Sequence, residues 1–330
     1  MRFDNVYIKE TATVAGHLER DGSFGKYFDK TYDDYYMDDG NSLELSETKL
    51  FKDSIDILLK KASVTKDDID LVVAGDLQNQ ITASCYGVKD YDIPFLGVYA
   101  ACATSMESVI IASSLLDSFK VSKVICSTCS HNLAEEKQFR NPVEYGGPKP
   151  KTATFTATGG ASILLTNEKT NIKVSSATIG KIVNLGQNDV NNMGAIMAPA
   201  AADTIKRHLD FMGETKDDYD LILTGDLGIF GMEILKDYMA KVYNIKLDKN
   251  YNDCGAMLYN LKEQKEITAG GSGPVCSALV NYGYVYDMLK KGNLKRVLLC
   301  PTGALFSPIY AYQKQDILGI AHAVTIEVVK

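Results

Sequence analysis

Cys102 is the residue of this chain best placed to do chemistry. It lies in the stretch IPFLGVYAACATSMESVIIASSLLDSF, between a short apolar run and a long run of apolar and small residues. Where a strand passes into a helix, free backbone N–H groups and the positive end of the helix dipole lower the pKa of a thiol. This position predicts that Cys102 faces a ligand, although a small buried residue at a tight turn would produce the same pattern.

The other cysteines indicate reduced, buried thiols. The chain has 7 cysteines, an odd number, and most have apolar or small neighbours. Cys126 and Cys129 form a C-x-x-C motif, but the motif follows the strand-like KVICS and does not open a helix. No second pair stands at the spacing of a zinc site. We therefore expect neither a redox centre nor a metal site.

Composition limits the classes of partner. The formal charge is -7, from 42 acidic and 35 basic residues, and no run of Lys or Arg forms a nucleic-acid footprint. The N-terminus has no apolar signal-peptide core, and no stretch reaches the roughly 18 apolar residues of a membrane helix. We expect no nucleic-acid partner, no signal peptide, no transmembrane segment, and at most a peripheral membrane contact.

An internal repeat organises the chain. TKDDIDLVVAGDL at 65–77 recurs as TKDDYDLILTGDL at 215–227, with 9 identities in 13 positions. Each half also alternates strand-like runs with long helical patterns, which is typical of mostly parallel sheets. The helix after Cys102 is apolar on nearly all sides and should lie between layers. These features predict an α/β protein of two duplicated βαβ halves, residues 1–170 and 171–330.

The two halves and the AACATSME segment resemble the thiolase-like superfamily, which includes thiolases and ketoacyl synthases. The resemblance implies a five-layer αβαβα fold with a cysteine at Cys102. It also implies His and Asn, or two His, on two loops of the second half. Those loops read LILTGDLGIFG and TAGGSGPVCSA and contain neither residue. The only later histidines are His208, expected on an exposed helix, and His322. We therefore expect no catalytic residues.

A closer resemblance is to the stage V sporulation protein AD family of endospore-forming bacteria. It rests on segments spread from about residue 70 to about residue 310: GDLQNQ, ACATSMES, SHNLAEEKQFRNPVEYGG, MAPAAADTIKRHL, YDLILTGDL, NDCG, AGGSG and TGALFSP. This resemblance implies a non-enzymatic protein of the developing spore and spore, peripheral to the inner membrane. It implies binding of dipicolinic acid or its calcium chelate, no cofactor beyond calcium carried with that ligand, and other stage V sporulation membrane proteins as partners.

Dipicolinate is flat and carries two carboxylates, so its site needs apolar walls and hydrogen-bond donors. The helix N-terminus after Cys102 could supply amides, and further groups come from loops that follow strands. His131 is either a ligand contact or a loop hydrogen bond, and Arg140 is a cation that could instead pair with a nearby glutamate. The predicted ligand-binding residues are Asp76, Asn79, Cys102, Thr104, Ser105, His131 and Asp226.

Three other interpretations remain open or disfavoured. A divergent thiolase- or ketoacyl-synthase-like acyltransferase using Cys102 is the main alternative, and a structural partner with an empty pocket is the second. A nicotinamide enzyme is disfavoured, because no G-x-G-x-x-G follows a strand and opens a helix. The thiolase-like resemblance also implies a homodimer in which the first halves pair through an edge strand and adjacent loops. The segment 131–158, which has no counterpart in the second half, is the predicted dimer contact and lid.

Overall fold

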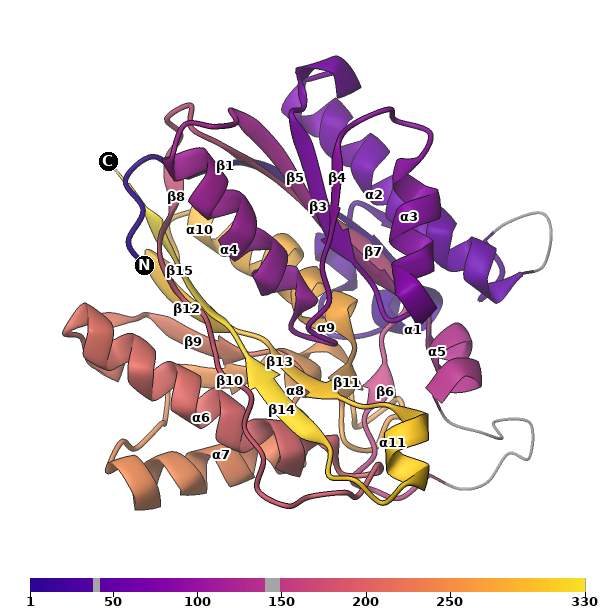
Figure 1. Cartoon of the computed structure of the whole chain (residues 1–330), viewed down its shortest axis with the longest axis vertical. Helices are drawn as coiled ribbons and strands as arrows, with labels where there is room; N and C mark the ends of the chain where they lie inside the picture. The colour runs from indigo at the N-terminus through magenta and orange to yellow at the C-terminus, as the bar shows by residue number, and fades with distance from the viewer. Residues whose placement is uncertain (38–41, 140–148, 330) are drawn as a thin grey trace.

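Two five-stranded units with the same connectivity form the centre of the molecule (Figure 1). The computed structural model describes residues 1–37, 42–139 and 149–329. The first unit has the order β4-β3-β5-β7-β1, and the second has β10-β9-β12-β15-β8. Numbered along the chain within each half, both orders read third, second, fourth, fifth, first. A single pairing, Tyr7 with Lys173, joins the two units into one continuous sheet.

The ten strands have these bounds: β1 (Tyr7–Ala15), β3 (Leu71–Gly75), β4 (Phe95–Gly97), β5 (Lys123–Ser130), β7 (Gly159–Thr166), β8 (Ile172–Thr178), β9 (Leu221–Thr224), β10 (Tyr251–Asp253), β12 (Arg296–Cys300) and β15 (Ala323–Val328). Short elements join these strands and the main helices: α1 (His17–Arg20), η1 (Gly25–Tyr27), β2 (Lys30–Thr31), η2 (Lys66–Asp68), η3 (Asn79–Ile81), α5 (Asn132–Phe139), β6 (Phe155–Thr156), η5 (Lys216–Asp218), α8 (Cys254–Leu258), β11 (Gly271–Ser272), β13 (Thr302–Leu305), α11 (Pro308–Tyr312) and β14 (Leu318–Ala321).

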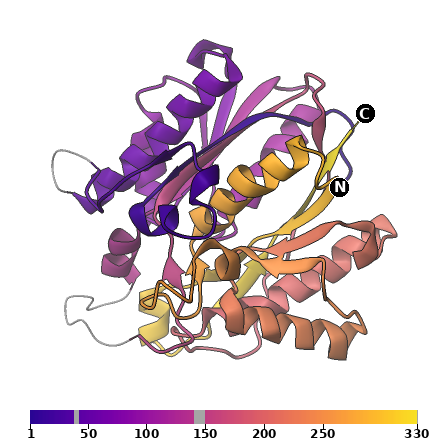
Figure 2. The same ribbon diagram turned by 180° about the vertical axis from the view of Figure 1, so that it is seen from behind.

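Helices complete five layers, as the sequence predicts. Two of them, α4 (Thr104–Asp117) and α9 (Pro274–Leu279), contact each other between the two sheet units. The helix α9 continues through a π-helical turn, η6 (Val280–Val285), into α10 (Tyr286–Lys290). The outer layers, seen in Figures 1 and 2, are α2 (Leu43–Ala62) with α3 (Thr82–Val88), and α6 (Met193–Met212) with α7 (Gly228–Tyr243).

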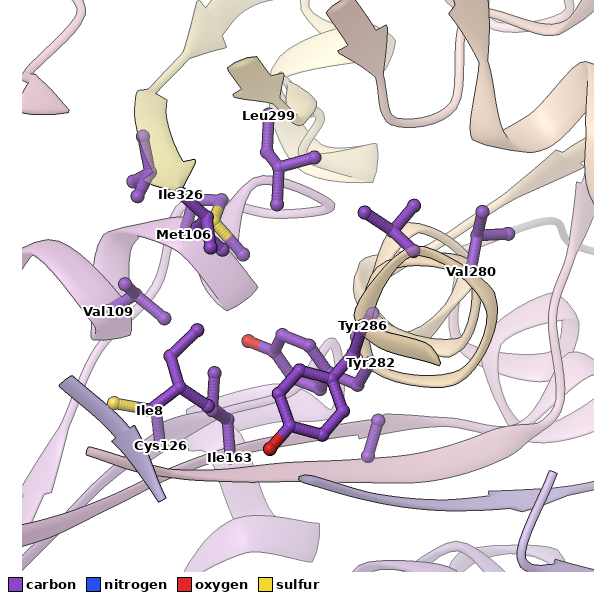
Figure 3. Close-up of a cluster of buried hydrophobic side chains, with 14 of the residues drawn as sticks. Ile8, Met106, Val109, Cys126, Ile163, Val280, Tyr282, Tyr286, Leu299 and Ile326 are labelled. Atoms are coloured by element: carbon purple, nitrogen blue, oxygen red, sulfur yellow. The ribbon is translucent and has the colours of Figure 1, made fainter. Parts of the chain in front are cut away.

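The largest hydrophobic core surrounds the central helices (Figure 3). Met106 and Val109 of α4 lie on the side of the other central helix that carries Tyr282, with strand residues such as Ile163 beneath them, and Val280 belongs to the same core. All five side chains are at least nine-tenths buried. A helix that is apolar on all sides is stable only when it is covered on all sides, and this core explains the composition of α4.

The repeated TKDD sequence forms the same turn in both halves. Thr65 and Asp68 form a capping box at η2, and Thr215 with Asp218 does so at η5. The aspartate two residues after each turn also has the same role. The Asp70 carboxylate accepts hydrogen bonds from the N–H groups of Ser122 and Lys123, and Asp220 accepts from those of Lys295 and Arg296. The repeat therefore preserves turn chemistry that aligns two neighbouring parallel strands.

Several local predictions need correction. The sequence predicts a helix near Asp203 to Met212, but this helix begins ten residues earlier, at Met193, because its small residues pack closely on α7. A Cβ on Gly194 would lie 2.9 Å from the Cα of Gly231. His208 is buried, not exposed, and its ring bonds Thr178 and Thr325 at 2.9 Å each.

The sequence also predicts a strand pair around Gly159 and Gly160 and a strand at KEITAGG, and the structure differs at both places. The strands β6 and β7 are not paired with each other. Instead β6 pairs with β11, and β7 pairs with β1 and β5. Residues 265–270 of the expected strand KEITAGG form no strand, and only β11 follows them. The expected division at residue 170 falls between β7 and β8 and stays a prediction. None of the helices in the described parts of the chain is both long and apolar enough to cross a membrane.

Candidate functional site

A cavity of about 380 Å³ opens onto Cys102, in the size range of small-molecule sites. Its walls come from both halves of the chain and are mostly apolar or aromatic. The Phe139 and Phe306 rings lie 6.0 Å apart, centroid to centroid, and give the cavity two flat faces. Its other lining residues are Leu77, Tyr99, Ala101, Glu135, Glu136, Thr154, Thr156, Val190, Asn191, Met193, Met197, Ser272, Gly273, Ala304, Pro308, Ala311 and Tyr312.

A strained turn presents the Cys102 thiol to this cavity. Ala101 has φ 49°, a left-handed conformation that is unusual for a residue with a Cβ and that often marks functional sites. The hydroxyl of Thr104 holds the turn closed, since it accepts from the N–H of Ala100 at 3.0 Å and donates to the carbonyl of Ala101 at 2.6 Å. The helix α4 begins immediately afterwards. Cys102 as a whole residue is partly exposed, as a ligand contact requires, although protein atoms surround its sulfur.

The surroundings of the thiol keep it protonated. Burial is the main cause that raises the pKa of Cys102 well above the usual value of a thiol, and the neighbouring Asp226 carboxyl raises it further. The N–H of Gly273, at φ 94°, acts in the opposite direction but does not compensate. Asp226 itself is buried, its pKa is raised to about 7 by desolvation, and it accepts a hydrogen bond from the Thr302 hydroxyl. An activated cysteine usually has a cation or an imidazole beside it, whereas Cys102 faces a carboxyl group whose negative charge opposes formation of the thiolate.

No histidine lines the cavity, and all four of the chain lie in its described parts. His131 is buried, with Nε2 2.8 Å from the carbonyl oxygen of Tyr35, and its Nδ1 accepts from the N–H of Ala134 at 3.4 Å. Of the two roles considered for His131, a ligand contact or a loop hydrogen bond, this geometry matches the loop hydrogen bond. His208 bonds two threonines, and His322 accepts from the N–H of Gly180 at 3.2 Å. The structure therefore gives Cys102 no imidazole partner.

The two aspartates of the repeat have different roles, although the sequence predicts that both face the pocket. Asp226 lies against Cys102, although it is not one of the residues that line the cavity. The Asp76 carboxylate is fully buried, does not line the cavity, and accepts from the N–H groups of Gln78 and Ser84 and from the Ser84 hydroxyl. Asp76 therefore orders the loop before α3, because every bond it makes is to that loop or helix.

The remaining predicted residues support the site from outside it. Thr104 is buried in the turn described above, and the Ser105 hydroxyl lies 3.2 Å from the Ser277 hydroxyl, which links the two central helices. Asn79 lines an adjoining groove, where its N–H donates to Oε1 of Gln138 at 2.8 Å. Arg140 and residues 140–148 of the predicted lid lie outside the described residues. The described remainder of segment 131–158 supplies walls of the cavity.

Sequence reasoning missed most of the residues that line the cavity. Glu135 is the most important of these, because it is 2% exposed and yet faces the cavity. Tyr99 stands three residues before Cys102, and Phe306 belongs to the C-terminal TGALFSP segment. Glu135 lies four residues after the predicted site residue His131, on the helix α5 that follows β5, and this spacing was the available signal that Glu135 is near the site. A glutamate next to another glutamate is expected to be solvent-exposed, so the sequence did not indicate that Glu135 is buried.

The described residues include no group of three or more His, Cys, Asp or Glu side chains arranged to hold a metal ion. Cys126 and Cys129 lie on the buried strand β5, and burial raises the pKa of both thiols. Thiol chemistry needs a thiolate, so these two cysteines are suited to packing.

Comparison with known proteins connects this geometry to one family and one fold. The sequence pattern of the family described as Stage V sporulation protein AD (SpoVAD) matches residues 1–327. The chain is 44% identical over 322 residues to Stage V sporulation protein AD of Bacillus subtilis (strain 168), covering 98% of this chain and 94% of that protein.

Solved structures share the fold at low identity. The 3-oxoacyl-[acyl-carrier-protein] synthase III of Aquifex aeolicus VF5 superposes with a TM-score of 0.60 at 12% identity, over 98% of this chain and 99% of that one. A variant of Xanthomonas campestris OleA superposes with a TM-score of 0.63 at 14% identity, over 99% of each chain. These likenesses establish the thiolase-like fold, and at such identity they establish nothing about activity.

Proposed function

Because the chain belongs to the stage V sporulation protein AD family and therefore has a role in sporulation, we propose that it binds dipicolinic acid, free or as its calcium chelate, without transforming it. The Cys102 cavity is the proposed binding site. Cys102 is a contact in this site and not a nucleophile. The protein assists the movement of dipicolinic acid into the developing spore and its release at germination.

One observation carries this proposal: the cavity has the shape of a small-molecule site but lacks the groups for acyl transfer. Flat apolar walls from Phe139 and Phe306 suit a pyridine ring. Burial and Asp226 hold Cys102 as a thiol, and no histidine is present to remove its proton. A cavity that presents a cysteine but keeps its thiol protonated is suited to binding a small molecule without reacting with it.

The partners are other stage V sporulation membrane proteins, and the protein lies peripherally on the inner membrane. The helix α11 supports a contact of this kind beside the cavity. Its Ile309, Tyr310 and Tyr312 are 67%, 61% and 75% exposed, and Tyr312 also lines the cavity. Adjacent exposed apolar side chains are typical of interaction surfaces. A protein partner seated there would stand at the entrance to the ligand site.

A homodimer is the proposed assembly, formed through the outer edge of β4. This strand ends the first sheet unit, and no other strand of the described residues pairs with its outer side. Its Leu96 is 41% exposed, and Tyr99 just after it is 44% exposed. An uncovered apolar edge strand favours pairing with another chain, and a second copy offers the same edge.

Isothermal titration calorimetry with dipicolinate tests the proposal. Benzene-1,3-dicarboxylate is the matched control ligand, because it keeps the two carboxylates and the flat ring but lacks the pyridine nitrogen. Titrations with calcium and with a calcium chelator separate the two forms of the ligand. We expect saturable binding of dipicolinate that the variant Cys102→Phe abolishes. Absence of binding by the unmodified protein, with or without calcium, would overturn the proposal.

An acyltransferase using Cys102 is the competing function, and the strained turn before Cys102 together with the N–H of Gly273 favours it. Incubation with acyl-coenzyme A and mass spectrometry of the intact protein distinguishes the two. We expect no acyl adduct. An adduct that disappears in Cys102→Ala would establish the acyltransferase instead.

A further inference from the structure

Glu135 is a buried carboxyl group in the wall of the proposed binding site. It lies on α5, is 2% exposed, and lines the cavity. Neither of its side-chain oxygens receives a hydrogen bond from any donor among the described residues. Burying an ionised carboxylate without donors is costly, so its environment must favour the neutral acid.

The neighbours of Glu135 are themselves acidic. The Glu47 carboxyl of α2 contacts it, and Asp76 lies close enough to repel it. Glu47 already accepts from the Gln78 amide at 2.8 Å and from the Cys129 thiol at 3.5 Å. Desolvation first, and then these carboxyl groups, raise the pKa of Glu135 well above its usual value and that of Glu47 to about 8. The surroundings of both groups therefore favour the protonated form.

This arrangement leaves a donor for the cavity. With both carboxyls neutral, the Glu47 hydroxyl can donate to one oxygen of Glu135, while the Glu135 hydroxyl can donate to a ligand. Among the described residues that line the cavity there is no lysine, arginine or histidine. A carboxylate entering this cavity must therefore be recognised by neutral donors.

We propose that Glu135 recognises the ligand as a neutral carboxylic acid, which donates a hydrogen bond to a ligand carboxylate. The inference rests on the proposed function and names the chemistry of the same site: the preferred ligand is a free carboxylate. A calcium chelate makes the opposite demand, because calcium would coordinate an ionised Glu135. Binding of the free acid should weaken as pH rises and Glu135 loses its proton, since two like charges then face each other.

Other titratable groups could also give a pH dependence. Those that face Glu135 or its side of the cavity are Glu47, Asp76, Tyr99, Cys102, Cys129 and Glu136. Glu136 differs from Glu135 because it forms an ion pair with Lys149 at 3.0 Å. Asp226 also titrates near pH 7 beside Cys102. The informative quantity is therefore the difference in pH dependence between the unmodified protein and a variant at position 135.

Calorimetry with sodium dipicolinate and a calcium chelator, at pH 6.5 and pH 9, tests the inference. Glu135→Gln keeps a neutral donor, so it should bind well at both pH values and change affinity less than about 3-fold between them. The unmodified protein should lose about 10-fold or more, and Glu135→Ala should be about 10-fold weaker than it at pH 6.5, the loss expected for a hydrogen bond to a charged group. Glu44→Gln removes a carboxyl group that pairs with Lys137 of the helix that carries Glu135 but lies outside the cavity, so it is the matched control and should follow the unmodified protein. Thermal melts verify that each variant is folded.

Three results would overturn the inference. Glu135→Ala binding as tightly as the unmodified protein would remove Glu135 from the site. A pH dependence that Glu135→Gln leaves unchanged would assign it to Asp226 or another group. A Glu135→Gln variant that loses affinity only for the calcium chelate would make Glu135 a calcium ligand. If the unmodified protein does not bind dipicolinate, the proposed function fails and the inference fails with it, whereas the other three results leave the proposed function intact.

Discussion

Replacing Asp226 by asparagine should make the Cys102 thiol much more acidic. In the native protein the Cys102 thiol lies beside the Asp226 carboxyl, which favours the thiol and repels the thiolate. A neighbouring charge shifts a pKa by roughly 1 to 3 units, which corresponds to about 10-fold to 1000-fold in the thiolate fraction. Since the pKa of Asp226 is about 7, its carboxylate exerts this effect above neutral pH and loses it below. The effect of the substitution should therefore be large at pH 8 and small at pH 6.

The rate of alkylation by iodoacetamide, followed by mass spectrometry of peptides, measures this change. Cys85 is exposed on α3 and serves as the internal standard. In Asp226→Asn at pH 8, Cys102 should be alkylated at least about 10-fold faster than in the unmodified protein, while the rate of Cys85 should not change. The symmetry-related variant Asp76→Asn is the control. Burial and Asp76 raise the pKa of Cys85, so that variant should accelerate Cys85 and leave Cys102 unchanged.

An unchanged Cys102 rate in Asp226→Asn, with native circular dichroism, would refute the reasoning. It would mean that burial alone protects the thiol and that the carboxyl group is incidental. Acceleration of Cys102 by Asp76→Asn would show instead that the two aspartates are electrostatically equivalent, contrary to their positions.

Three further predictions concern stability, the pocket and assembly. Burial raises the pKa of Glu19 from 4.5 to about 7, so its stabilisation is complete below pH 4.5 and is lost as pH rises through 7. Glu19→Gln should remove roughly 3 kcal/mol of that pH dependence in denaturant unfolding at pH 4.5 and pH 8, and parallel pH profiles would contradict this. Cys102→Ala should weaken dipicolinate binding by about 1 kcal/mol and Cys102→Phe should abolish it in calorimetry, whereas equal binding by both would place the ligand elsewhere. Leu96→Glu on β4 should convert a dimer into a monomer in sedimentation equilibrium, and a dimer that persists would exclude that edge.

The architecture could be predicted from the sequence because it depends on patterns repeated within the chain. The 150-residue offset between the TKDD segments predicts two similar halves, and the structure gives both the same strand order. The TKDD turns and the aspartates that follow them use mainly local hydrogen bonds, so the same residues form the same turn in both halves. Cys102 was identifiable for the same reason, because a strand end, a turn and a helix start are adjacent in the chain.

The contents of the site were decided by contacts between distant residues. Asp76 and Asp226 occupy the same place in the repeat, yet one is held by Ser84 and the other by Thr302. The pKa of Glu135 is raised because folding buries its carboxyl group and because α5 packs on α2, which brings Glu47 to it. A sequence pattern specifies which face of a helix is apolar, but the pKa and direction of a polar side chain depend on which other elements desolvate it and offer hydrogen bonds, and only the folded chain brings those elements together.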